Sequence, residues 1–212
     1  ACHPVVYGSD NFEYSADYPG ALCAEVQRNI KGNPICIFVN GACGDMNPYC
    51  WDIGNKDRKE QVEEIGKGIA KEVIRIAKSI KTKCCSDKMA ILFERKSFKT
   101  SSRWDEEKKY EVPVSVVLIT PEIAWVGLPG EFFVRFQEDL RRRSPVKYLI
   151  VSGYTNGDLG YFPTIEAAVK GGYGADWQTD VEVGTGEHSV IESIVSLYKL
   201  TGKLKPEPSS GK

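Results

Sequence analysis

The segment NPICIFVNGACGDMNPYC, residues 33–50, joins a short apolar run to a loop of unusual composition. Residues 35–39 are all apolar, which predicts a strand buried on both faces. The loop after it, residues 41–48, contains two glycines, an aspartate, an asparagine and a proline, more special backbone residues than a bend requires. Because loops that leave strand ends often carry functional groups, this loop is a candidate wall of a site.

Apolar residues at helical spacing predict helices on both sides of this segment. In residues 17–32, Asp17 is the expected N-cap and Pro19 lies in the first turn, where its missing N–H costs nothing. Asp57 and Glu60 have the spacing of a capping box before the longest periodic pattern in the chain. Its apolar positions are Val62, Ile65, Ile69, Val73, Ile76 and Ile80.

The second half of the chain alternates between strand and helix patterns. Strands are expected at residues 89–99, 112–121, 123–130 and 147–153; helices are expected from Glu131 to Arg143 and within 186–202, and a glycine-rich loop between Gly153 and Tyr173. This order predicts an α/β fold of mixed β-sheet layers flanked by helices. We expect one domain over residues 1–202 and a disordered tail over 203–212.

Composition excludes several classes of protein. The 212 residues carry a formal net charge of −1, which argues against a nucleic-acid partner, and no apolar run is long enough for a transmembrane segment. The seven cysteines form no C-x-x-C pair, which favours free thiols in a reducing compartment and hence a cytoplasmic location. The chain begins at Ala1 with neither an initiator methionine nor a signal core, so we expect a fragment of a longer protein.

Four residues in separate loops carry side chains that bind metals: His3, Glu131, Tyr161 and Tyr173. Each also has an ordinary structural explanation, such as a packed histidine, a carboxylate in the first turn of a helix, or aromatic cover over a turn. Taken together, an imidazole, a carboxylate and phenols form a ligand set for zinc or another hard metal. The residue types alone leave both explanations open.

Four motifs occur in the order typical of one enzyme family. They are CHPVVYGSDNFEYSADYPG at 2–20, FVNGACGDMNP at 38–48, LPGEFFVRF at 128–136 and GYTNGDLGYFPTIEAAVKGGYGAD at 153–176. In this set and order the chain resembles the neutral/alkaline (non-lysosomal) ceramidase family, and most closely its prokaryotic ceramidase-like branch. The resemblance covers residues 2–198 and corresponds to the second, C-terminal part of the family's catalytic domain.

The resemblance implies a zinc-dependent amidase that cleaves the N-acyl bond of ceramide, with zinc held by two histidines, a glutamate and a tyrosine. By motif, His3 matches the second histidine, Glu131 the glutamate and Tyr161 the tyrosine, while Tyr173 matches a second tyrosine that stabilises the transition state. The first histidine belongs to a preceding segment. The N-terminal part of the same protein is therefore an expected partner that completes the zinc site.

The sequence departs from the family at Asn47, which occupies the position of the catalytic serine in the family hexapeptide G-D-x-S-P-N. Asparagine cannot form an acyl-enzyme, but it can hydrogen-bond near developing charge. The compatible reaction is direct attack by a metal-activated water, because a bound metal lowers the pKa of water toward neutrality. Tyr173 and Asn47 would then stabilise the oxyanion.

Three functions follow from these residues. The first is a metal-dependent hydrolase of C–N bonds, or of esters, acting on a small-molecule or lipid-like amide. The second is a catalytically silent metal- or ligand-binding module of the same fold, with Asn47 as the lesion. The third is a hydrolase restricted to small soluble substrates, since no stretch resembles a lipid anchor.

Overall fold

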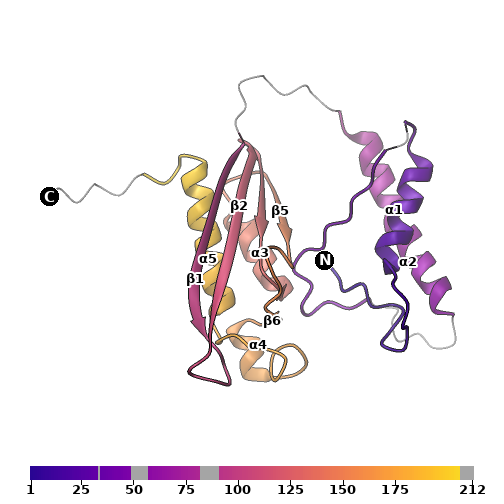
Figure 1. Cartoon of the computed structure of the whole chain (residues 1–212). Coiled ribbons are helices and arrows are strands. Elements are labelled where there is room, and N and C mark those ends of the chain that lie inside the picture. The colour runs from indigo at the N-terminus through magenta and orange to yellow at the C-terminus, as the bar shows by residue number, and fades with distance from the viewer. Residues whose placement is uncertain (33, 49–56, 82–90, 206–212) are drawn as a thin grey trace. The chain divides into compact units, whose positions relative to one another are not determined.

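The computed structural model describes residues 1–32, 34–48, 57–81 and 91–205 (Figure 1). Its contacts group into two compact units. The first unit contains Ala1, the loop Asn40–Met46 and residues 91–205. The second unit contains residues 2–32, 34–39, 47–48 and 57–81. In the described part of the chain, no helix is both long and apolar enough to cross a membrane.

The first unit is built on a four-stranded sheet in the order β1-β2-β3-β5. These strands are β1 (Leu92–Ser101), β2 (Lys109–Thr120), β3 (Ile123–Gly127) and β5 (Tyr148–Ser152). β1, β2 and β3 pair in antiparallel fashion, whereas β3 and β5 are parallel. The sheet is therefore mixed, as the order of sequence patterns predicts.

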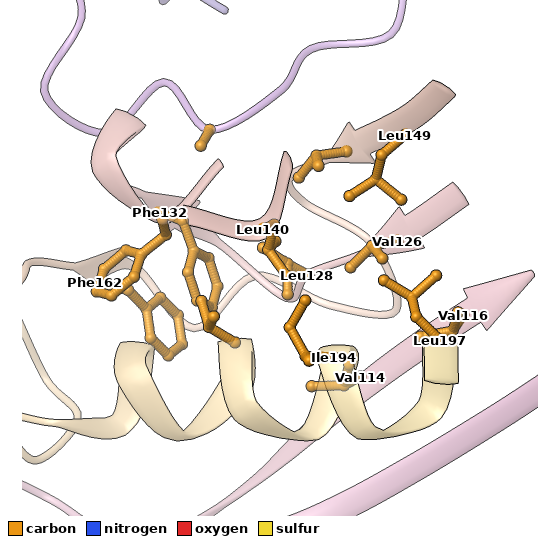
Figure 2. Packing of buried hydrophobic residues seen from close by; sticks show 14 of the residues in the cluster. Val114, Val116, Val126, Leu128, Phe132, Leu140, Leu149, Phe162, Ile194 and Leu197 are labelled. Carbon is orange, nitrogen blue, oxygen red and sulfur yellow. The ribbon is translucent and has the colours of Figure 1, made fainter. Parts of the chain in front are cut away.

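Helices α3 (Val134–Arg143) and α5 (Thr185–Leu200) pack with this sheet to form the core. Every second residue of the central part of β2, from Val112 to Leu118, belongs to the buried cluster, because side chains alternate between the two faces of a strand. Figure 2 shows Val114, Val116 and Val126 beside Ile194 and Leu197 of α5. The predicted α/β class, with a mixed sheet flanked by helices, is confirmed.

The second unit pairs α1 (Asp17–Asn29) with α2 (Arg58–Ser79). The predicted cap of α2 is confirmed, since the Asp57 carboxylate accepts a hydrogen bond from the Lys59 N–H at 3.3 Å. Asp17 is not the N-cap of α1 but its first residue. Its carboxylate accepts hydrogen bonds from the N–H groups of Tyr7 and Tyr18, so it ties the preceding loop to the helix.

The prediction of a buried strand at residues 35–39 is wrong. The segment is not assigned as a strand, and Ile35 and Ile37 are 85% and 78% exposed. Within this segment, Cys36 and Phe38 are the side chains that pack against the hydrophobic clusters formed by α1 and α2. Apolar composition makes a strand only where a neighbouring strand accepts its backbone hydrogen bonds.

Two further differences lie around the expected loop of residues 153–173. The helix expected to begin at Glu131 begins at Val134, because Glu131–Phe132 forms a short strand, β4, that pairs with β6 (Tyr161–Phe162). The loop itself contains a helix, α4 (Ile165–Lys170), whose N-cap Thr164 accepts a hydrogen bond from the Ala167 N–H. At the end of the chain, the Lys203 N–H still donates to Tyr198, while 206–212 of the predicted tail fall outside the described residues.

Candidate functional site

The two-stranded parallel sheet of β4 and β6 sets the centre of the site. Glu131 is the register partner of Tyr161, and Phe132 is the partner of Phe162. The phenylalanines are fully buried and stacked, with ring centroids 4.1 Å apart. Figure 2 labels both side chains among the buried residues of the core. Because neighbouring residues of a strand face opposite ways, burying this pair turns Glu131 and Tyr161 together toward the other face.

The loop Asn40–Met46 holds β4 in place. Its Gly44 N–H donates to the Phe132 carbonyl at 2.9 Å, and its Asp45 carboxylate accepts from the Val134 N–H at 2.7 Å. A Cβ at Gly44 would lie 2.4 Å from the Glu131 carbonyl oxygen, so only glycine permits this approach. Asp45 thus caps α3, which has no side-chain cap of its own.

Tyr173 lies beside Tyr161. Their ring centroids are 5.6 Å apart in an edge-to-face arrangement, and Trp177 continues the series at 6.0 Å from Tyr173. Gly174 has φ +78°, and a Cβ there would lie 2.7 Å from the Tyr161 ring. The absence of a side chain at this position lets the loop close against Tyr161 while Tyr173 stays 69% exposed.

The segment that carries Tyr173 and Trp177 is well supported. The buried Thr179 hydroxyl donates to the Gly174 carbonyl at 2.8 Å, and the Trp104 indole N–H donates to the Thr179 carbonyl at 2.9 Å. The Arg103 guanidinium donates to the Ala175 carbonyl at 2.9 Å. These bonds hold the backbone of a segment that presents two exposed aromatic side chains next to Tyr161, a favourable arrangement for binding a ligand.

Electrostatic interactions link Glu131 to two phenols. The pKa of Tyr161 is raised above its ordinary value. Burial is the largest cause, followed by the hydrogen bond and the charge interaction with the Glu131 carboxylate, and then by the interactions with Tyr173. Burial also raises the pKa of Tyr154, with further contributions from Cys43, Glu131 and Tyr161 in that order. Both phenols therefore stay protonated around a carboxylate, which can accept from a hydroxyl or bind a cation.

The structure brings together three of the five predicted site residues: Glu131, Tyr161 and Tyr173. His3, which is partly buried, and Asn47, which is exposed, belong to the second unit. Their placement beside Glu131 stays a prediction.

Sequence reasoning did not select two residues of this neighbourhood. The first is Trp177, and its only sequence signal is a spacing of four from Tyr173. The second is Tyr154, which no sequence pattern distinguished.

The donor atoms present fit part of a zinc ligand set. Glu131 offers a carboxylate, and its strand partner Tyr161 offers a phenol oxygen on the same face. Among the described residues, no three side chains of histidine, cysteine, aspartate or glutamate converge.

Comparison of folds defines the class of protein. No family model and no curated protein matches the sequence. The fold nevertheless matches solved ceramidase structures, so the chain has a ceramidase-like fold. The neutral ceramidase from Pseudomonas aeruginosa superposes with a TM-score of 0.74 at 12% identity, over 99% of this chain and 44% of that one. A ceramidase complexed with C2 gives 0.76 at 12% identity, over 99% and 46%. The chain thus spans less than half the length of these structures.

Proposed function

We propose that this chain forms part of a zinc-dependent hydrolase that cleaves an amide (N-acyl) or ester bond. The observation that carries the proposal is the convergence of Glu131, Tyr161 and Tyr173 on one face of a ceramidase-like fold. A carboxylate flanked by neutral phenols, with one phenol exposed, provides both a cation ligand and a hydrogen-bond donor for substrate.

Glu131 and Tyr161 would hold the metal, together with His3 and a histidine from a further segment of the same protein. When bound, zinc polarises the scissile carbonyl and makes water a better nucleophile at neutral pH. Water is the nucleophile in this proposal because Asn47, at the position of the family serine, cannot be acylated.

In this proposal the exposed Tyr173 hydroxyl would donate a hydrogen bond to the carbonyl oxygen as negative charge develops on it. Its ring is held by the edge contact with Tyr161, so the hydroxyl does not have to be ordered during the reaction. Asn47 would add a second donor. Its replacement by alanine should therefore weaken hydrolysis without abolishing it.

The test combines metal analysis with a panel of N-acyl amides and esters, short and long, on the full protein. We expect about one zinc per chain, and loss of zinc together with loss of turnover in Glu131→Gln and Tyr161→Phe. Tyr148→Phe is the matched control, because Tyr148 lies exposed on β5, with the Lys147 ammonium over its ring, and should change neither. No zinc in the unaltered protein, or full activity in Glu131→Gln, would contradict the proposal.

Asn47 favours one alternative, a catalytically silent module that binds metal or ligand but does not turn over. Zinc binding without hydrolysis of any member of the panel would select this alternative.

For location we propose the cytoplasm, because the four described cysteines, Cys2, Cys23, Cys36 and Cys43, are all thiols.

A further inference from the structure

Tyr154 has a backbone conformation that is unfavourable for a residue with a side chain. Its φ is +51°, in the left-handed region that glycine occupies more easily. Three consecutive N–H groups impose this conformation: Gly153 donates to Asn40, Tyr154 to Gly130 and Thr155 to Leu128. The three acceptors are carbonyls of the loop Asn40–Met46 and of the residues just before Glu131, so the backbone of residues 153–155 connects these two segments by hydrogen bonds.

The side chain of Tyr154 contacts the same loop, Asn40–Met46. Its hydroxyl is 3.5 Å from the sulfur of Cys43, which is fully buried in the loop Asn40–Met46, whereas Tyr154 as a whole is 40% exposed. A thiol is a weak hydrogen-bond partner, so the contact with Cys43 alone is a poor reason to keep a tyrosine in a left-handed conformation.

We propose that Tyr154 is a positioning residue of the hydrolase site: its hydroxyl holds the loop Asn40–Met46 through Cys43, and this loop supports the strand that carries Glu131. This inference rests on the proposed function. It assigns a role to a third phenol outside the ligand set that the family resemblance implies. Tyr154 acts on Glu131 through this loop and does not itself bind zinc, in the way that outer residues orient metal ligands.

Tyr154→Phe tests this role, because it removes the hydroxyl and keeps the ring and the backbone conformation. Equilibrium dialysis against zinc should show an association constant about 10–100-fold lower, the usual effect of losing a partner that orients a metal ligand. Labelling of the folded protein with a disulfide reagent, followed by mass spectrometry of the Cys43 peptide, should show faster modification of Cys43. Tyr148→Phe should change neither quantity.

Cys43→Ala and the double variant with Tyr154→Phe distinguish the loss of the Tyr154–Cys43 contact from a general loss of stability. If the hydroxyl acts on the loop through Cys43, the fold-changes in zinc affinity of the two single variants do not multiply in the double variant. Multiplying effects, or an unchanged zinc constant and labelling rate in Tyr154→Phe, would overturn the proposal. If the unaltered protein binds no zinc, the proposed function fails, and the labelling rate then decides whether Tyr154 holds the loop.

Discussion

Glu131 and Tyr161 are direct partners across the parallel sheet of β4 and β6. The pair one residue further on, Phe132 and Phe162, is stacked in the core. Hydrophobic burial of the second pair therefore fixes the direction of the first, because strand residues alternate between faces. The chemistry of the site therefore depends on the packing behind it.

Glu131 controls the titration of its phenol neighbours. In metal-free protein, Glu131→Gln should lower the pKa of Tyr161, because it removes the negative charge that disfavours tyrosinate. The pKa should nevertheless stay above the ordinary tyrosine value, since burial is the largest cause of the shift. Ultraviolet difference titration of tyrosinate measures this. Glu138→Gln on the exposed surface of α3 is the control, and an equal shift there would contradict the prediction.

Stability should fall at alkaline pH. The pKa values of Tyr154 and Tyr161 are raised in the folded protein, so above about pH 10, the ordinary tyrosine value, the unfolded chain loses these protons while the folded chain keeps them. Their stabilising contribution is thus complete below about pH 10 and is lost as pH rises toward the folded pKa values. Urea midpoints of metal-free protein from about pH 8 to 11 should fall less steeply in Tyr161→Phe. An equal slope in the variant would count against the prediction.

Asp45 should stabilise the first unit as a cap supplied from another segment. Asp45→Ala leaves the Val134 N–H without its 2.7 Å acceptor and should cost about 1 kcal/mol in the free energy of unfolding. Asp45→Asn retains an acceptor oxygen and should restore most of this loss in urea unfolding. If Asn is as destabilising as Ala, the charge beside the helix N-terminus and not the hydrogen bond is responsible.

Two glycines of α2 should respond in opposite directions to the same substitution. A Cβ at Gly66 would lie 2.6 Å from Ala21 and 2.7 Å from the Leu22 nitrogen, so Gly66→Ala must push α1 and α2 apart and should destabilise by about 1–3 kcal/mol. A Cβ at Gly68 meets nothing within 4 Å, so Gly68→Ala should stabilise by about 0.5–1 kcal/mol through helix propensity. Unfolding midpoints of the two variants that move in the same direction would refute the helix contact.

Local patterns were sufficient for several elements. The spacing of apolar residues predicted α2 and α5, and the Asp57 cap followed from residue type, because helix periodicity and capping involve neighbours in sequence. β2 was equally clear, since its valines alternate onto the buried face. Motif order predicted the ceramidase-like fold, which the structural neighbours show at only 12% identity.

Contacts between distant segments decided the rest. Residues 35–39 are as apolar as a core strand, yet they form no strand because no neighbouring strand pairs with their backbone, and Cys36 and Phe38 pack against the helix clusters instead. Glu131 begins a strand and not a helix because the Gly160 carbonyl accepts its N–H. The loop GACGDMN, which begins at Gly41, supports β4 through hydrogen bonds of Gly44 and Asp45. The hydroxyl of Tyr154 contacts the buried thiol of Cys43 in the same loop. The sequence by itself determined which residue types are available and where the periodic elements lie, because these properties are local. Only the tertiary structure decided that Glu131, Tyr161 and Tyr173 meet, because backbone pairing and core packing between remote segments set the direction of each side chain.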